Sequence, residues 1–268
     1  MHRHEKNLTH LQSILPFKDS SAEKLPNFVL EVLRTKRVFD LKGNPQALES
    51  NVSLSEASSL HAAVRLIRPM RSLEIGLAHG VSALSILGAI AANGSGHHYV
   101  IDPFQRNYGY CGEAMIARAG LSALHTFVER YPEEVIPNLP GLQFAFIDSS
   151  HLFDLTILEF VLIDKKLDVG GIVALHDLWM PSIQAAVRFI LANRAYQIFR
   201  DVSADMMKLS LHQTFKERMG QWLGKIPMAD RIFTANVLRP WSAFRAQNLV
   251  FLRKASGDQR DWRFHQRY

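Results

Sequence analysis

The sequence predicts an α/β protein built on a doubly wound parallel sheet with helices on both faces. Two observations support this fold class. Short apolar segments alternate with segments of helical pattern between residues 72 and 253, which is typical of consecutive βαβ units. The apolar segments also lack polar alternation, as expected for strands that helices cover on both sides. Ligands of such sheets bind at the carboxyl ends of the strands, so the residues that follow each strand are the informative ones.

The first helix is expected to begin at a capping box. Ser53 and Glu56 have the spacing at which two side chains satisfy free backbone N–H groups at a helix start. Apolar residues continue the helical pattern, and Pro69 ends it. Residues 1–50 are of mixed character, with turn signals at 42–45. We therefore expect residues 1–50 to form a helical or irregular N-terminal extension.

Seven strands are expected after Pro69. They cover residues 72–75, 98–102, 126–129, 142–148, 170–177, 196–199 and 248–253. The helices between them are expected at residues 81–92, 112–121, 131–139, 152–167 and 182–192. The alternation of strands and helices is regular as far as residue 199, and the last strand follows after a long excursion.

Composition limits the class of protein. A chain of 268 residues allows one large domain, or one domain with an appendage. Its 47% hydrophobic and 21% charged residues exclude a mainly disordered chain. No apolar run has the roughly 18 residues of a membrane span, and the first residues lack the apolar core of a signal peptide. A single cysteine, Cys111, excludes an intramolecular disulfide framework, so we expect a cytoplasmic protein.

Positive charge is concentrated in the C-terminal quarter. Residues 206–268 hold 12 Lys and Arg against 4 Asp and Glu, while the whole chain has a net charge of +6. Such a region can attract nucleic acid, anionic lipid or an acidic partner, but a solvated surface explains it equally. Because the region contains no run of five or more basic residues, nucleic acid is not the expected partner.

A glycine-bearing turn follows the first of the seven strands. It reads Glu74-Ile-Gly76-Leu-Ala-His-Gly80-Val-Ser82, and glycine there lets the backbone approach a ligand closely. Dinucleotide enzymes carry G-x-G-x-x-G at this place. Here the spacing is G-x-x-x-G, and the acid before it is a poor neighbour for a pyrophosphate. The turn therefore favours a nucleoside without phosphates over NAD, the alternative being a tight turn that simply needs two glycines.

Asp102 ends the next strand, 28 residues after Glu74. An acid at this position can accept hydrogen bonds from both hydroxyls of a ribose. A turn or helix cap is the alternative for an Asp at a strand end. Together with the glycine turn, Asp102 favours a nucleoside site.

The segments LEIGLAHGVSAL, VIDPF, AFIDSSHLFD and GGIVALHD resemble class I S-adenosylmethionine-dependent methyltransferases. The similarity is greatest to small-molecule O-methyltransferases of the catechol and caffeoyl-CoA type and their bacterial relatives. This resemblance implies a Rossmann-like sheet of seven mostly parallel strands with the last strand antiparallel. It also implies a methyltransferase domain at 51–256, an insertion at about 204–245, and a basic C-terminal tail at 257–268.

The resemblance further implies the cofactor site. The first turn would hold the methionine part of S-adenosylmethionine, Asp102 the ribose, and Glu129 with Arg130 the vicinity of the adenine. The residues of the turn that carry this expectation are Glu74, Gly76, Gly80 and Ser82.

Catalysis is expected where the fourth and fifth strands end. Metal-dependent relatives place ligating acids at the positions of Asp148 and Asp177, and a base at the position of His151. Leu178 stands where these relatives have a third oxygen ligand, which puts the metal in doubt. His176 could supply a nitrogen ligand to a softer cation than Mg²⁺, such as Mn²⁺. Without a metal, His151 can act as the base by itself.

The expected function is the transfer of a methyl group from S-adenosylmethionine to a small-molecule acceptor, at a hydroxyl oxygen. Two alternatives stay open: an NAD(P)-dependent oxidoreductase on a Rossmann-like fold, and a non-catalytic module that binds through the basic C-terminal region. Residues 205–224 carry an apolar stripe at helical spacing. This stripe could pack on the sheet, cover the substrate as a lid or form a homodimer contact.

Overall fold

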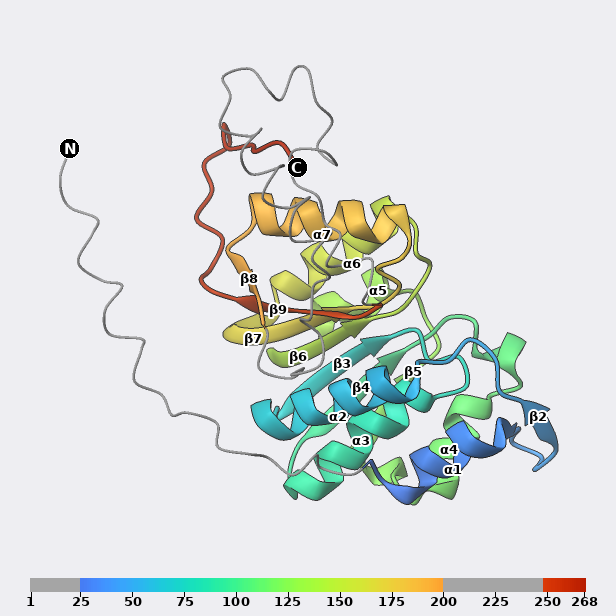
Figure 1. Cartoon of the computed structure of the whole chain (residues 1–268). Helices are drawn as coiled ribbons and strands as arrows, with labels where there is room; N and C mark the ends of the chain where they lie inside the picture. Colours follow the sequence, from blue (N-terminus) through green and yellow to red (C-terminus); the bar gives the residue numbers. More distant parts are fainter. Residues whose placement is uncertain (1–24, 200–247) are drawn as a thin grey trace, which may run out of the picture.

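The computed structural model describes residues 25–199 and 248–268 and is organised around one seven-stranded sheet (Figure 1). The strands are β3 (Arg71–Ile75), β4 (His97–Ile101), β5 (His125–Val128), β6 (Leu142–Ile147), β7 (Leu167–Leu175), β8 (Tyr196–Ile198) and β9 (Val250–Lys254). Their spatial order is β5-β4-β3-β6-β7-β9-β8. Strands β3 to β7 are parallel, and β9 pairs antiparallel with both β7 and β8. The predicted fold class is confirmed, including the antiparallel last strand.

Helices cover both faces of the sheet (Figure 1). One face carries α1 (Asn27–Thr35), α2 (Leu54–Ile67), α3 (Val81–Asn93) and α4 (Cys111–Arg118), and the other carries α5 (Pro132–Val135), α6 (Phe153–Asp164) and α7 (Pro181–Asn193). Two apolar cores result, one on each side. Strand β6 supplies both: Phe144 and Phe146 point into the first core, and Ala145 and Ile147 into the second. This alternation follows from the period of two along a strand.

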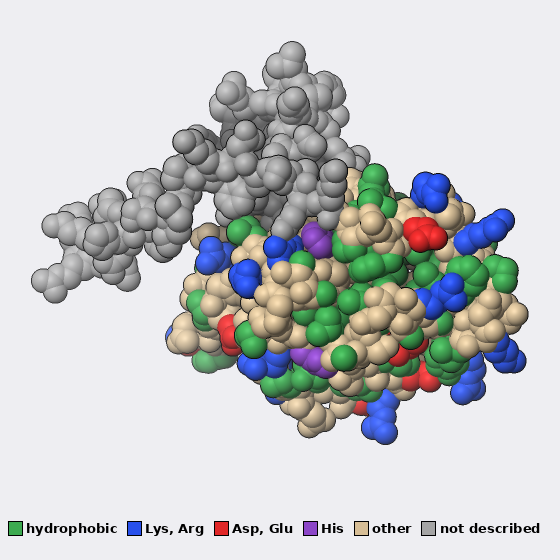
Figure 2. Space-filling view, turned by 90° about the horizontal axis from the view of Figure 1, so that it is seen from below, with side chains coloured by type: hydrophobic (Ala, Val, Ile, Leu, Met, Phe, Trp, Pro, Cys, Tyr) green, Lys and Arg blue, Asp and Glu red, His purple; other side chains and the backbone are tan. Residues whose placement is uncertain are grey.

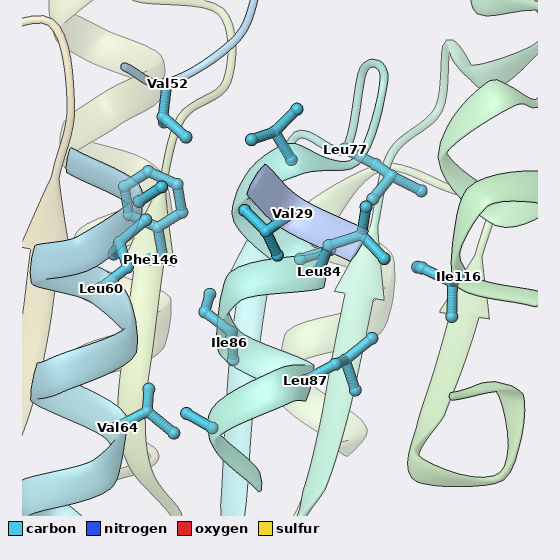
Figure 3. Close-up of a cluster of buried hydrophobic side chains, with 14 of the residues drawn as sticks. Val29, Val52, Leu60, Val64, Leu77, Leu84, Ile86, Leu87, Ile116 and Phe146 are labelled. Atoms are coloured by element: carbon cyan, nitrogen blue, oxygen red, sulfur yellow. The ribbon is translucent and has the colours of Figure 1, made fainter. Parts of the chain in front are cut away.

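The first core explains why α3 is apolar around most of its surface. Leu84, Ile86 and Leu87 are almost fully buried, and the helix lies between the sheet and its neighbours α1, α2 and α4 (Figure 3). A helix enclosed in this way needs apolar residues on every side. Burial of each such side chain contributes about 1.5–3 kcal/mol, so the turn that precedes α3 is held by a rigid support.

The predicted capping box is present at the start of α2. Ser53 N donates to Glu56 Oε2 at 2.5 Å, and Glu56 N donates to Ser53 Oγ at 3.3 Å. Before this helix, a hairpin of β1 (Arg37–Phe39) and β2 (Pro45–Ala47) uses the predicted turn region. Asp40 Oδ1 closes that turn by accepting hydrogen bonds from Lys42 N and Asn44 N.

Some expected boundaries were wrong, for local reasons. The helix expected at 152–167 ends at Asp164, and β7 begins at Leu167 rather than at Gly170 because Leu167 pairs with Leu142 ahead of an irregularity in the ladder. The helix expected at 131–139 divides into α5 and a 3₁₀ turn, Ile136–Asn138. That turn contains Pro137, which has no N–H to continue an α-helix.

Two sequence predictions fall on residues 200–247, outside the described residues: the insertion at about 204–245 and the helical stripe at 205–224. The C-terminal residues 257–268 are described and contain no helix or strand. Within residues 25–199 and 248–268, no helix has the length and apolar character needed to cross a membrane.

Candidate active site

The glycine turn joins β3 to α3 at the carboxyl edge of the sheet. Gly76 and Gly80 have φ values of 91° and 81°, and Ala78 between them also has a positive φ, of 44°. Asp102, directly after β4, holds this backbone: its Oδ2 accepts hydrogen bonds from Leu77 N at 3.0 Å and Ala78 N at 3.2 Å. The two motifs that indicated a nucleoside site in the sequence are therefore in direct contact.

Close packing of backbones requires both glycines. A Cβ on Gly76 would lie 1.9 Å from the carbonyl oxygen of Asp148, and a Cβ on Gly80 would lie 2.9 Å from Gly112 Cα. The tight-turn alternative thus accounts for the two glycines without any ligand. The same contact has a second consequence, because it seats the turn against the residue that follows β6.

Glu74 lies beneath this turn and is fully buried. Ser82 Oγ donates to its Oε1, and His98 Nε2 lies 3.0 Å from its Oε2. The Nδ1 atom of His98 lies 2.9 Å from Ser72 Oγ. Burial raises the pKa of Glu74 well above its usual value and lowers the pKa of His98 to about 3.

An uncharged Glu74 would not repel a pyrophosphate. The preference against NAD therefore rests on the G-x-x-x-G spacing of the turn, because an acid at the position of Asp102 also serves the ribose of NAD in dinucleotide enzymes. Glu74 itself is enclosed by protein in this structure, and its two oxygens face Ser82 and His98.

The remaining predicted cofactor residues lie at the same edge of the sheet. Asp102 is buried, and it also accepts hydrogen bonds from Phe104 N at 2.8 Å and Gln105 Nε2 at 3.0 Å. Glu129 follows the neighbouring strand β5 and is exposed. Tyr110 Oη donates to its carboxylate, at 3.0 and 3.2 Å. The segments after β4 and β5 thus contribute polar groups at the edge of the sheet where the glycine turn lies.

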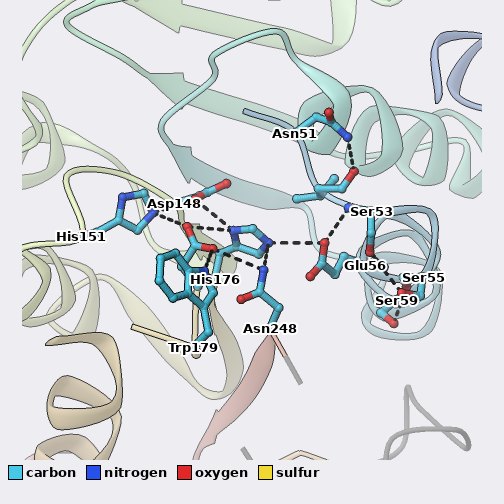
Figure 4. Close-up of polar contacts among 12 residues, drawn as sticks. Asn51, Ser53, Ser55, Glu56, Ser59, Asp148, His151, His176, Trp179 and Asn248 are labelled. Atoms are coloured by element: carbon cyan, nitrogen blue, oxygen red, sulfur yellow. Dashed lines mark hydrogen bonds and ion pairs between the residues drawn. The ribbon is translucent and has the colours of Figure 1, made fainter. Parts of the chain in front are cut away.

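The four predicted catalytic and metal residues meet after β6 and β7 (Figure 4). His151 Nε2 lies 2.7 Å from Asp177 Oδ2 and 3.2 Å from Asp148 Oδ1. His176 Nδ1 lies 3.2 Å from the same Asp148 oxygen and 3.5 Å from Asp177 Oδ2. The structure therefore brings together two carboxylates and two imidazoles that are up to 29 positions apart in the chain.

Each imidazole in this cluster favours the charged form. Hydrogen bonds to Asp148 and Asp177 raise the pKa of His151 to about 9. Burial alone would lower the pKa of His176, but its contacts with Asp148, Asp177 and Glu56 outweigh this and raise it to about 12. Burial works to raise the pKa of Asp148 and Asp177, but hydrogen bonds from the two histidines prevail and lower both. The described cluster is a set of mutually neutralising charges.

Backbone strain coincides with the site. His151 has a φ of 59° and Asp177 a φ of 55°. Few residues other than glycine adopt this left-handed region, although Asn, Asp and His do so more often than the rest. Ala78 in the glycine turn is a third example. Each such residue costs of order 1–3 kcal/mol and persists where the surroundings demand it. All three lie in loops that would face a ligand, although other described residues, including the helix C-caps Lys36 and Arg68, also have positive φ.

Three atoms of the cluster could ligate a cation. Asp148, His151 and Asp177 each offer one ligand atom, and these atoms lie within 4.8 Å of one another. A set of two carboxylate oxygens and one imidazole nitrogen suits Mn²⁺ better than Mg²⁺, which prefers oxygens and water. The donor set therefore fits a divalent cation, with His151 in the group rather than the expected His176. Leu178, at the position of a third oxygen ligand in relatives, is fully buried in the apolar core.

Two residues that contact the cluster, Glu56 and Asn248, were not predicted as site residues from the sequence. Glu56 Oε2 lies 3.5 Å from His176 Nε2, and Asn248 Nδ2 lies 3.1 Å from the same nitrogen. Trp179 is 64% exposed, and its indole Nε1–H donates to Asp177 Oδ1 at 2.8 Å. The capping box was the one available signal for Glu56, but it indicates a helix start and not a contact with a strand end.

Part of the chain is similar to a known protein family. Residues 73–178 match the model of a family described as a methyltransferase domain. That segment includes the glycine turn, Asp102 and all four members of the charged cluster. The match makes residues 73–178 similar to a methyltransferase domain, and the strand order is that of the solved structures described next. Comparison with curated protein sequences gave no match.

Solved structures show the same fold at low sequence identity. The O-methyltransferase TomG of Streptomyces achromogenes, involved in tomaymycin synthesis and solved with S-adenosylmethionine, has a TM-score of 0.52 and 17% identity, over 66% of this chain and 82% of its own. An O-methyltransferase of Bacillus cereus in complex with S-adenosylhomocysteine has a TM-score of 0.54 and 15% identity, over 67% and 85%. A putative O-methyltransferase of Klebsiella pneumoniae has a TM-score of 0.52 and 16% identity, over 66% and 83%.

Proposed function

We propose that this protein transfers the methyl group of S-adenosylmethionine to a hydroxyl oxygen of a small molecule. One observation carries the proposal: the segment that matches a methyltransferase domain is the segment whose glycine turn packs against the charged cluster, through Gly76 and Asp148. A cofactor held by the turn would present its sulfonium to that cluster. The structural neighbours whose complexes contain S-adenosylmethionine or S-adenosylhomocysteine support the choice of cofactor.

In the proposed complex, Asp102 binds the ribose. Its Oδ2 accepts hydrogen bonds from Leu77 N, Ala78 N and Gln105 Nε2. Ribose hydroxyls would donate to the same carboxylate, either beside these N–H groups or in place of some of them. Gly76, Gly80 and Ser82 shape the turn around the methionine part, and Glu74 supports it from below through its contact with Ser82. Glu129 lies on the side where the adenine would extend.

Methyl transfer forms an O–C bond as the S–C bond breaks, and the acceptor hydroxyl must lose its proton. Holding the acceptor in line with the sulfonium supplies much of the catalysis. We assign proton removal to His151. The carboxylates of Asp148 and Asp177 hold its ring and raise its pKa to about 9. A sulfonium bound beside it would lower that pKa towards neutrality, because a like charge disfavours the imidazolium, and a base is most effective near the working pH.

A divalent cation is the alternative means of activating the hydroxyl. Asp148, Asp177 and His151 would hold it, and such a cation lowers the pKa of a bound hydroxyl. His151 cannot be a ligand and the free base at once, so the two forms of the mechanism are distinguishable. Full activity of wild-type protein after EDTA treatment would favour His151 as base, whereas loss with EDTA and recovery with Mn²⁺ would favour the cation.

Calorimetric titration tests the proposed function. S-adenosylmethionine and S-adenosylhomocysteine should both bind, whereas NADH should not. Transfer of a labelled methyl group to a panel of phenols, sugars and other hydroxyl compounds should then identify the acceptor class. The absence of binding by either nucleoside at high micromolar concentration would reject the proposal, and binding of NADH instead would support the oxidoreductase alternative.

A non-catalytic module that binds nucleic acid has less support. On the face shown in Figure 2, Lys and Arg side chains of the described residues are dispersed, with other side chains between them, and do not form one continuous patch. Retention on DNA or RNA that falls steeply with salt, and is lost on removal of residues 206–268, would revive this alternative. A cytoplasmic location and a homodimer remain predictions of the sequence.

A further inference from the structure

The side chain of Glu56 makes two separate contacts. As the last residue of the capping box, its Oε2 accepts a hydrogen bond from Ser53 N at 2.5 Å. The same oxygen lies 3.5 Å from His176 Nε2, an ion-pair distance across the gap between α2 and the end of β7 (Figure 4). A capping box needs Glu or Gln at this position, but it does not need the side chain to reach another element. The second contact is therefore not explained by the helix start.

His176 is held from several directions. Its side chain is only 8% exposed, and its ring meets the ring of Phe146 edge-on at a centroid distance of 6.1 Å. Nδ1 faces Asp148 Oδ1 at 3.2 Å, and Nε2 faces Glu56 and Asn248 Nδ2. A rotation of the ring about its Cβ–Cγ bond would take both nitrogens away from these partners. The contacts at Nε2 thus help to fix the direction in which Nδ1–H points.

Asp148 is the carboxylate that depends on this arrangement. Its Oδ1 is shared between His176 Nδ1 and His151 Nε2, both at 3.2 Å. When His176 is fixed, its Nδ1–H donates to Asp148 Oδ1 and keeps the carboxylate oriented towards His151. Without the hydrogen bond from His176, the half-buried carboxylate of Asp148 would be free to turn away from His151.

We propose that Glu56 is a positioning residue of the active site, which holds the ring of His176 so that His176 Nδ1–H orients Asp148 towards His151. The consequence for methyl transfer rests on the proposed function, but the hydrogen-bond geometry does not. Residues that hydrogen-bond the side chains of a site fix the orientation of those side chains. Mutation of such a supporting residue typically reduces activity or metal affinity by about 10–100-fold. Glu56 would have this role from the start of α2, 120 positions before His176.

Two substitutions separate positioning from capping. Glu56→Gln keeps the length of the side chain and can still serve the capping box, but it removes the negative charge that faces His176. Ser53→Ala is the matched control, because it removes the hydroxyl that accepts from Glu56 N and leaves Glu56 and the backbone N–H of Ser53 in place. Loss of such a cap should lower the melting temperature by about 2–4 °C.

NMR of protein labelled with ¹⁵N-histidine provides the readout. The wild-type protein should show a downfield imidazole N–H resonance for His176 Nδ1–H bound to Asp148, assigned by its loss in His176→Asn. In Glu56→Gln this resonance should disappear or move upfield, and in Ser53→Ala it should be unchanged. Turnover with an identified acceptor should fall by about 10–100-fold in Glu56→Gln, while the affinity for S-adenosylmethionine stays within about twofold of wild type.

The proposal is overturned if the wild-type protein lacks the resonance, or if Glu56→Gln keeps it unchanged. If Glu56→Gln does not fold, Glu56→Asp serves instead, because it keeps the charge but withdraws it from His176 by one methylene. It should lose the resonance as well, and an unchanged resonance would again overturn the proposal. Failure of wild-type protein to bind S-adenosylmethionine would reject the proposed function alone, because the NMR comparison needs no cofactor.

Discussion

Replacement of Gly76 by alanine tests whether the glycine turn and the charged cluster form one structural unit. In the structure, the added Cβ would lie 1.9 Å from Asp148 O and 2.8 Å from Asp148 C. Ordinary contacts begin near 3.4 Å, so the turn or the end of β6 must move by about 1.5 Å. Both atoms belong to the backbone, and no side-chain rotation can relieve the overlap.

The expected loss of stability has two parts. Alanine at a φ of 91° costs roughly 1–2 kcal/mol of conformational strain. Overpacking adds about 1–3 kcal/mol, so the free energy of unfolding should fall by about 2–5 kcal/mol. Gly94→Ala is the matched control, because Gly94 has a φ of 73° and nothing within 4 Å of the added Cβ. The free energy of unfolding of Gly94→Ala should fall only by the cost of the conformational strain.

Urea unfolding of the wild type and both variants measures these free energies, and calorimetry measures the affinity of each for S-adenosylhomocysteine. Gly76→Ala should lose about 1–3 kcal/mol more than Gly94→Ala and bind the nucleoside at least tenfold more weakly. Equal stability losses in the two variants, with equal affinities, would refute the packing of the turn against Asp148.

Three further predictions concern single side chains. His151→Ala should reduce methyl transfer by roughly 10²–10⁴-fold with cofactor affinity unchanged; normal turnover would remove its role as base. In EDTA-treated protein, the free energy of unfolding of wild type should exceed that of His151→Gln. This difference should be fully present below about pH 6.5. It should disappear as the pH rises through about 9, because the folded state raises the pKa of His151. Thermal unfolding between pH 6 and 10 checks this, and a difference independent of pH would contradict it. Asp102→Asn should weaken S-adenosylhomocysteine binding at least tenfold in calorimetry, and unchanged affinity would exclude the ribose contact.

The sequence predicted the central sheet well because its strands have a strong local pattern. Strands β3, β4, β5 and β6 are short apolar-rich runs next to a glycine or an acid, and burial on both faces leaves the pattern simple. The ends of elements were predicted less well. The start of β7 depends on the pairing of Leu167 with Leu142, and such long-range pairing leaves no signal in either segment alone.

In the site too, features with a local sequence signal were predicted and features that depend on long-range contacts were not. Asp148, His151, His176 and Asp177 were predicted because they follow strands, and parallel strands end at a common edge. Glu56 was predicted as a helix cap only, since its contact with His176 requires the relative placement of α2 and β7. The burial of Glu74 was also missed, because the sequence does not show that Ser82 and His98 enclose its carboxyl group. Residues 200–247 lie outside the described part, so the predicted insertion remains a prediction.

A crystal structure of the protein soaked in S-adenosylhomocysteine would show directly whether the glycine turn holds the nucleoside. We expect density along the turn, with both ribose hydroxyls on Asp102 and the sulfur facing the cluster of Asp148, His151 and Asp177. A well-ordered glycine turn with no nucleoside density beside it, and no ribose at Asp102, at saturating nucleoside would contradict it.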